Sequence, residues 1–272
     1  MLQASSELQA MIGAAEAAGA GLMRRFSQLG ELQIRTKTGP ADLVSIADEE
    51  AERSIHDRLG KLHPKFGFVG EEGGTTIGRD SGESWVVDPL DGTTNFLFGT
   101  PLWGVNVALV REGEVVAGVS WLPALGEMYV AEQGAGAWLN GERIHVSSRH
   151  RLVDSLVACG IPFAGKPDHP VFAREMALLS PRTAGIRRTG ACSVDMAYVA
   201  AGRWDAYWER ALKSWDMAPG VILVREAGGM VTSATGTALD LQGGTVCASN
   251  GAIHGVLMER LNQAFADPSA PA

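Results

Sequence analysis

The sequence predicts a mixed α/β fold, and three observations support this prediction. Apolar residues recur at helical spacing near the N-terminus, short apolar runs separated by turn residues fill the middle, and strands alternate with helices after about residue 147. The 272 residues suffice for one large domain or two modest ones. We therefore expect one compact unit with two closely packed halves, residues 1–147 and 148–267, followed by a flexible tail at 268–272.

Two amphipathic helices are expected in the first half. Residues 5–28 carry an apolar stripe that includes Leu8, Met11 and Leu22, which indicates a helix that packs on the core. Ser45 and Asp48 have the spacing of a capping box at the start of the second helix. The remaining elements of this half are expected to be strands at 66–70, 85–87, 103–110, 115–121 and 127–131, with turns at 112–113 and 126 and a hairpin turn at 140–141.

The second half reads as an alternation of strands and helices. Glycine follows two of its helical patterns directly, at Gly202 and Gly228, as expected where a helix ends. Strands are expected at 155–159, 205–209, 230–233 and 245–248, and helices at 170–179, 193–201, 216–227 and 253–265.

Composition excludes several classes of protein. The chain has 23 Lys and Arg against 31 Asp and Glu, a net charge of −8, which argues against a broad basic surface for nucleic acid. No run of about 18 apolar residues is present, so we expect no membrane span. Three widely separated cysteines fit neither a closed disulfide framework nor a C-x-x-C site, and a reducing cytoplasm is the expected location.

Carboxylates follow several of the predicted elements. Glu71 and Glu72 come after one strand, Asp88 and Asp91 after the next, and Asp216 opens a helix. Taken alone, the Asp88 to Asp91 segment with its proline is also a good turn sequence. If the groups meet, however, like charges about 4 Å apart repel by roughly 4 kcal/mol at an effective dielectric near 20. Oxygen-only ligand sets select hard cations, so the clusters predict a site for several Mg²⁺ ions.

Such a site favours phosphoryl chemistry. Bound metal ions bridge an anionic substrate and lower the pKa of a bound water. Gly92, Thr93 and Thr94 directly follow Asp91, and their backbone N–H groups and hydroxyls could hold the phosphate. The acids would hold metal, and the Gly-Thr segment would hold the phosphate group.

These residues resemble the signature motifs of the inositol monophosphatase family, in particular its bacterial branch. The resemblance covers nearly the whole chain and implies an α-β-α-β-α sandwich of the inositol monophosphatase and fructose-bisphosphatase type. It also implies a homodimer that hydrolyses phosphate monoesters with two or three Mg²⁺ ions and is inhibited by Li⁺. The matching segments are Trp85-Val-Val-Asp-Pro-Leu-Asp-Gly-Thr-Thr-Asn-Phe96, Gly70-Glu-Glu72, Trp215-Asp-Met-Ala-Pro-Gly220, Glu226-Ala-Gly-Gly229, Pro40-Ala-Asp-Leu-Val44, Gly160-Ile-Pro-Phe163, Arg188-Thr-Gly190 and Ala197-Tyr-Val-Ala-Ala-Gly-Arg203.

The resemblance also implies roles for single residues. Glu71 with Thr93 would activate the attacking water, helped by Asp48. Cys192 and Pro219 depart from the residues expected at their positions, and a proline in the first turn of a helix is tolerable. The implied metal ligands are Glu71, Asp88, the carbonyl of Leu90, Asp91 and Asp216, and the implied substrate contacts are Asp91, Gly92, Thr93, Thr94, Gly190, Cys192, Glu209 and Asp216.

Several alternatives stay open at this stage. Histidinol phosphate or a nucleotide would suit the same metal core as inositol monophosphate or another polyol or sugar phosphate. Some bacterial relatives also act as accessory factors of RNA polymerase in antitermination. No D-x-D, G-x-S-x-G or P-loop string supports a different hydrolase or a nucleotide-triphosphate enzyme. Cys192 is expected to be a packing residue. All six histidines are expected in surface or capping positions: His56, His63, His145, His150, His169 and His254.

Overall fold

The computed structural model describes residues 4–31, 34–36, 43–78 and 82–266. The expected tail at 268–272 lies outside these residues, as do residues 40–42 of one quoted motif. The two predicted N-terminal helices are α1 and α2, and the helices as a whole are α1 (Ser6–Phe26), α2 (Ile46–Leu62), α3 (Thr93–Leu97), α4 (His169–Leu179), α5 (Cys192–Ala200), α6 (Ser214–Glu226) and α7 (His254–Ala266).

An eight-stranded sheet occupies the first half of the chain, in the order β10-β9-β8-β7-β6-β5-β3-β4. Its neighbours pair antiparallel except β3 and β5, which run parallel and therefore end at the same edge of the sheet. Its strands are β3 (Gly67–Gly70), β4 (Gly74–Thr76), β5 (Glu83–Asp91), β6 (Gly104–Arg111), β7 (Glu114–Leu122), β8 (Glu127–Glu132), β9 (Gly136–Leu139) and β10 (Glu142–Ile144).

A five-stranded sheet occupies the second half, in the order β12-β11-β13-β15-β14. β11 pairs parallel with β12 and β13, whereas β15 pairs antiparallel with β13 and β14. Its strands are β11 (Leu156–Cys159), β12 (Gly185–Arg187), β13 (Ala206–Arg210), β14 (Met230–Thr232) and β15 (Thr245–Ser249), and a separate pair is formed by β1 (Ile34–Thr36) and β2 (Leu43–Ser45).

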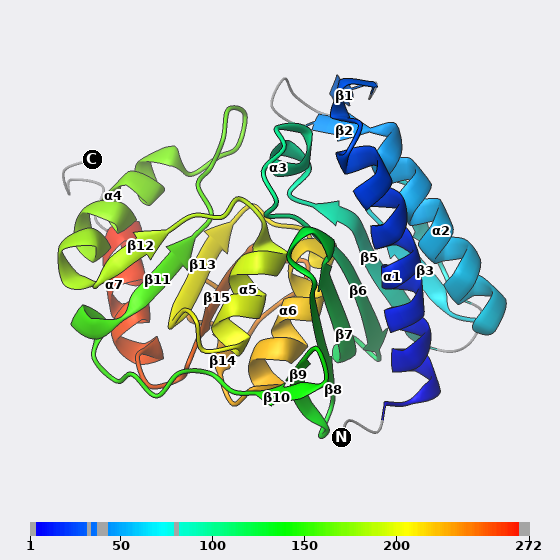
Figure 1. The fold of residues 1–272 in the computed structure, drawn as a ribbon. Coiled ribbons are helices and arrows are strands. Elements are labelled where there is room, and N and C mark those ends of the chain that lie inside the picture. The colour runs from blue at the N-terminus through cyan, green and yellow to red at the C-terminus, as the bar shows by residue number, and fades with distance from the viewer. Residues whose placement is uncertain (1–3, 32–33, 37–42, 79–81, 267–272) are drawn as a thin grey trace.

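The helices and the two large sheets stack in five layers (Figure 1). α1 and α2 cover one face of the eight-stranded sheet, α5 and α6 lie between the two sheets, and α4 and α7 cover the far face of the five-stranded sheet. Three buried apolar clusters fill the interfaces between these layers: one lies under α1 and α2, one surrounds α5 and α6 and reaches both sheets, and one lies under α4 and α7. The α-β-α-β-α sandwich expected from the resemblance is therefore confirmed. None of the described helices is long and apolar enough to cross a membrane.

Local sequence explains why the helices that carry the site begin where they do. The Ser45 side chain accepts a hydrogen bond from the N–H of Ala47, and the Asp48 carboxylate accepts one from the N–H of Ser45 at 2.9 Å, so the predicted capping box starts α2. Asp216 accepts in the same way from the N–H of Lys213 at 2.6 Å and fixes the start of α6. Both acidic side chains are thereby held at the positive end of a helix.

Three expectations need correction. Asp88 does not follow a strand, because β5 continues to Asp91 and shifts its register with β6 between these two residues. Pro219 is the sixth residue of α6 rather than part of its first turn, so its missing N–H leaves the carbonyl of Trp215 without the usual helical partner. His254 is buried and not at the surface, and its ring nitrogens form hydrogen bonds with Ser249 Oγ at 2.8 Å and Thr232 Oγ1 at 3.0 Å.

Candidate active site

A cavity of about 570 Å³ lies where segments from both halves of the chain meet. Glu71 reaches it from the loop after β3, Asp91 from the end of β5, and Asp216 from the first turn of α6. The cavity also contains the implied substrate contacts Gly92, Thr93, Thr94, Gly190, Cys192 and Glu209.

Three of the predicted residues lie behind this cavity and do not line it. Asp48 and Leu90 are each 1% exposed and Asp88 is 2% exposed. Thr93 connects two of them to the cavity, because its Oγ1 is 3.1 Å from Asp48 Oδ1 and 3.0 Å from the carbonyl oxygen of Leu90. The fold therefore brings all the residues of the predicted site into one region. Most of them line the cavity, and Asp48, Asp88 and Leu90 lie behind these.

The four carboxyl groups influence one another strongly. Burial raises the pKa of Asp88 well above its ordinary value, and the charges of Glu71, Asp91 and Asp216 raise it further. Burial also raises the pKa of Asp91 to about 6, although hydrogen bonds from Ser193 oppose this rise. The pKa of Asp216 is raised well above its ordinary value by burial and by the charge of Glu71. A positive charge placed among these groups would favour the ionised forms of Asp88, Asp91 and Asp216.

Backbone donors hold three of these carboxyl groups in place. The N–H of Leu90 donates to Asp88 Oδ1 at 3.0 Å. Asp91 Oδ2 accepts from the N–H of Ser193 at 2.6 Å and also from the Ser193 hydroxyl. Together with the Lys213 bond to Asp216 Oδ2, these contacts use one oxygen of each carboxyl group. Ser193 was not predicted as a site residue, although it directly follows Cys192 and begins the helix expected at 193–201.

The donor set of this region fits Mg²⁺. It consists of carboxylate oxygens and a backbone carbonyl, which are the ligands that this hard cation prefers. Among the described residues no group of three or more His, Cys, Asp or Glu side chains is already arranged to hold a metal ion. The convergence of these oxygen donors supports the fit, because a divalent cation would relieve the repulsion that raises the pKa values of Asp88 and Asp216.

Gly92 connects Asp91 to Thr93 and Thr94, the two residues whose hydroxyls could hold the phosphate. Its φ of +86° lies in the left-handed region, and a side chain there would come within 3.1 Å of the Leu102 carbonyl. The turn delivers Thr93 and Thr94 into the cavity immediately after Asp91. Asn95 donates from Nδ2 to the carbonyl of Thr189 at 2.8 Å and so ties this segment to the opposite wall.

The other end of the cavity could receive the alcohol part of an ester. Burial raises the pKa of Glu209 to about 7, although a hydrogen bond from the Tyr207 hydroxyl opposes the rise. Burial also raises the pKa of the Cys192 thiol well above its ordinary value, which suits the expected packing role and not a nucleophile. Residues missed from the sequence also line this end: Lys166, Arg188 and Asp195.

The signals for these missed residues were weak. Arg188 directly precedes Thr189 and Gly190 in a quoted motif, and Asp195 lies in the first turns of the predicted helix after Cys192. Burial raises the pKa of Asp195 well above its ordinary value, although a hydrogen bond from Thr189 opposes the rise. Lys166 belongs to a loop whose sequence gave no indication of its position.

Comparison with known proteins gives consistent results. A model of the inositol monophosphatase family matches residues 3–268. An inositol-1-monophosphatase of Caulobacter vibrioides is 47% identical over 257 residues, which cover 93% of this chain and 100% of that protein. A Pseudomonas aeruginosa protein named Nus factor SuhB is 40% identical over 247 residues, which cover 89% of this chain and 91% of that protein.

A solved structure shows the same architecture. The crystal structure of the extragenic suppressor protein suhB from Bartonella henselae superposes with a TM-score of 0.92 at 43% sequence identity, covering 95% of this chain and 99% of that one. The family model spans nearly the full length, and the signature residues meet in one cavity. The chain therefore belongs to the inositol monophosphatase family.

Proposed function

We propose that the protein is a Mg²⁺-dependent phosphomonoesterase that hydrolyses myo-inositol monophosphate or a similar polyol or sugar phosphate. The observation that carries this proposal is the meeting of Glu71, Asp91 and Asp216 with the Gly92 to Thr94 segment in one cavity. Asp88, directly behind them, adds a fourth acid to the group. Two or three Mg²⁺ ions would be held by these carboxylates and the Leu90 carbonyl.

Bound Mg²⁺ would supply Lewis-acid polarisation of the phosphate and lower the pKa of water in the site. The chain's own residues then orient the reactants. With the Leu90 carbonyl bound to a metal ion, Thr93 would donate its single hydroxyl proton to Asp48 Oδ1 and present an Oγ1 lone pair to the attacking water, while Glu71 would accept the water proton. Because Asp48 is itself fixed by the start of α2, the hydroxyl of Thr93 keeps this direction.

The alcohol part of the ester would lie toward Gly190, Cys192 and Glu209. Glu209 would accept hydrogen bonds from substrate hydroxyls, which selects polyols over simple esters. Histidinol phosphate is the second candidate substrate, since its ammonium group could pair with the Glu209 carboxylate. The alternative to an enzymatic function is a role as an accessory factor of RNA polymerase. Relatives named Nus factor SuhB support this alternative.

The experiment that tests the proposal measures free phosphate released by purified, chelator-treated protein with and without Mg²⁺. Inositol monophosphate, histidinol phosphate, a nucleoside monophosphate and p-nitrophenyl phosphate serve as substrates. The proposal expects Mg²⁺-dependent release, fastest with inositol monophosphate. Absence of release from every ester would contradict it, and preference for histidinol phosphate would favour the second substrate.

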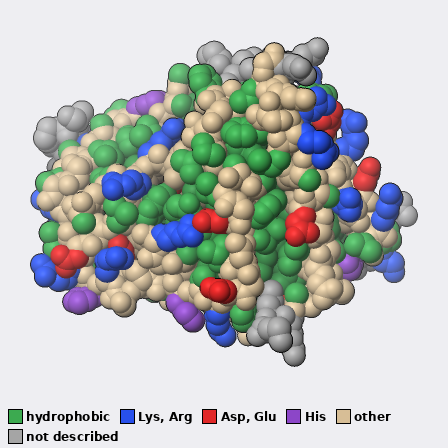
Figure 2. Space-filling view, in the orientation of Figure 1, with side chains coloured by type: hydrophobic (Ala, Val, Ile, Leu, Met, Phe, Trp, Pro, Cys, Tyr) green, Lys and Arg blue, Asp and Glu red, His purple; other side chains and the backbone are tan. Residues whose placement is uncertain are grey.

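We further propose that the protein is a cytoplasmic homodimer. Phe98 is 78% exposed and would be covered by an interface between copies, whereas Ile161 and Phe163, 42% and 40% exposed, line the cavity. All three cysteines are buried and free, which suits a reducing compartment. On the face shown in Figure 2, Lys and Arg side chains are dispersed and do not form one continuous basic area. Light scattering after size exclusion should give twice the chain mass.

A further inference from the structure

Glu52 on α2 contacts the loop that carries Glu71. Its side chain is 5% exposed, and its two oxygens accept hydrogen bonds from consecutive backbone groups, the N–H of Glu72 at 2.9 Å and the N–H of Gly73 at 2.5 Å. A carboxylate that accepts two backbone N–H groups makes strong, directional bonds. This one fixes the chain on the C-terminal side of Glu71.

Two glycines make room for the Glu52 carboxyl group. A Cβ atom at Gly73 would lie 2.7 Å from Glu52 Oε1, and one at Gly70 would collide with Glu52 Oε2. Neither glycine has a positive φ, so the backbone itself would accept alanine at both positions. The small residues on either side of Glu71 and Glu72 are thus explained by the approach of this side chain.

Glu52 lies one helical turn after Asp48, so the two acids share a face of α2. Asp48 holds the Thr93 hydroxyl, and Glu52 holds the backbone beside Glu71. A single rigid helix face therefore fixes both groups that the proposed reaction places on the attacking water.

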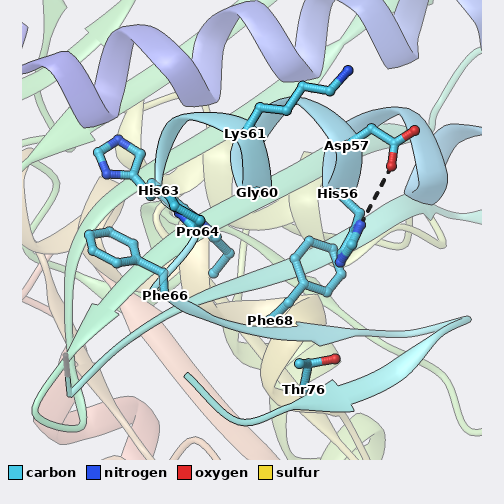
Figure 3. A pocket seen from close by; sticks show the side chains of 10 residues that line it. His56, Asp57, Gly60, Lys61, His63, Pro64, Phe66, Phe68 and Thr76 are labelled. Atoms are coloured by element: carbon cyan, nitrogen blue, oxygen red, sulfur yellow. Dashed lines mark ion pairs between the residues drawn. The ribbon is translucent and has the colours of Figure 1, made fainter. Parts of the chain in front are cut away.

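The outer side of the loop borders open space. A cavity of about 400 Å³ is lined by Glu52, Glu72 and Gly73, and Gly73 and Gly74 are exposed. It adjoins the cavity of about 340 Å³ shown in Figure 3, with which it shares His56, Phe68 and Thr76. The pairing of Gly70 with Gly74 closes this loop, and Glu52 adds an anchor that joins it to α2.

We propose that Glu52 is a positioning residue that sets the place of Glu71 relative to Thr93 and to the bound metal. The inference rests on the proposed function, because Glu71 matters only if it takes part in metal binding and hydrolysis. A shift of about 1 Å in a reacting group can lower a rate by about a hundredfold.

Glu52→Gln tests the proposal, because glutamine keeps the volume but offers one acceptor oxygen for two N–H donors. Glu50→Gln is the matched control, since Glu50 is on the same helix and pairs with exposed Arg25. We expect Glu52→Gln to lower kcat by about ten- to a hundredfold, with the KM for the ester changed less than about threefold. Calorimetry with Mg²⁺ alone should show about tenfold weaker binding.

Gly73→Ala disturbs the contact between Glu52 and the loop from the side of the loop. The added methyl group would displace the Glu52 carboxyl group and meets no other atom within 3.9 Å. Gly60→Ala on α2, where a Cβ meets nothing within 4 Å, is the control. Gly73→Ala should reproduce the losses of Glu52→Gln, and the double variant should lose little more than either single one.

The outcomes separate the two proposals. A structural role alone would lower Tm while leaving kcat of the folded protein and Mg²⁺ affinity at the values of the controls, and that result overturns the positioning role. If wild-type protein hydrolyses no ester, the proposed function fails, and Mg²⁺ calorimetry on the variants still decides whether Glu52 positions a metal-binding group. Wild-type protein that binds no Mg²⁺ would overturn both.

Discussion

Replacing Asp88 by asparagine is expected to have opposite effects on activity and on the stability of the metal-free protein. Asp88 is 2% exposed, and Glu71, Asp91 and Asp216 all raise its pKa by their charges. Asparagine keeps the shape and removes the charge. Hydrolysis should fall by about a thousandfold, because losing one metal ligand costs about 4 kcal/mol of transition-state stabilisation. The metal-free variant should nevertheless be more stable than wild type.

The size of the stabilisation follows from the buried charges. Two like charges about 6 Å apart repel by roughly 3 kcal/mol at an effective dielectric of 20. Wild-type protein escapes part of this repulsion by binding a proton, so the gain from Asp88→Asn should be about 1–2 kcal/mol near pH 8. For a chain of this size that corresponds to a rise in Tm of about 2–8 °C.

Thermal unfolding of chelator-treated protein measures this gain directly, and a second series with Mg²⁺ measures what the metal contributes. Mg²⁺ should raise the Tm of wild type, since a ligand that binds only the folded state stabilises it, and should raise that of Asp88→Asn much less. Asp154→Asn is the control, because Asp154 is exposed and forms an ion pair with Arg151, which is also exposed. Turnover within about threefold of wild type, or a lower Tm without metal, would refute the reasoning.

The remaining predictions concern substrate choice, pH and inhibition. Glu209→Gln should lower kcat/KM on inositol monophosphate by about ten- to 150-fold and leave p-nitrophenyl phosphate nearly unchanged, whereas equal losses on all esters would remove its specificity role. Because the folded pKa values of Asp91 and Glu209 are raised to about 6 and about 7, the folded state binds these protons more tightly, so metal-free stability should fall as pH rises from about 5 to 8 in chemical denaturation. Ser193→Ala removes a hydroxyl that lowers the pKa of Asp91 and should move the acidic limb of the pH–rate profile to higher pH; an unmoved limb would show that Asp91 does not set it. Li⁺ and excess Mg²⁺ should both slow phosphate release, and unchanged rates under both conditions would argue against a multi-metal mechanism.

Much of the fold could be predicted because the relevant signals are local. The apolar stripe of α1 packs as its spacing indicates, with Leu8, Met11 and Leu22 fully or almost fully buried. Asn140 and Gly141 both adopt positive φ and close the hairpin between β9 and β10. Short strands such as β4 and β12, three residues each, were missed because so few residues carry no recognisable period.

The sequence predicted which residues belong to the site, but not which of them line the cavity and which lie behind it. Motif residues such as Asp91 and Thr93 do meet in one cavity, whereas the position of Asp88 behind it depends on the continuation of β5 past a proline. Glu52 gave no signal, since its partners are backbone N–H groups 20 and 21 residues away. The burial of His254 likewise depends on Thr232 and Ser249, which only the tertiary fold brings to its ring.

Anomalous diffraction from crystals of the protein soaked with Mn²⁺, as a substitute for Mg²⁺, tests the central claim most directly. We predict two or three peaks among the side chains of Glu71, Asp88, Asp91 and Asp216, each about 2 Å from carboxylate oxygens, and one of them also beside the Leu90 carbonyl. Peaks confined to other parts of the surface, or an absence of peaks between these four acids at a Mn²⁺ concentration that supports hydrolysis, would contradict the assignment of the metal site.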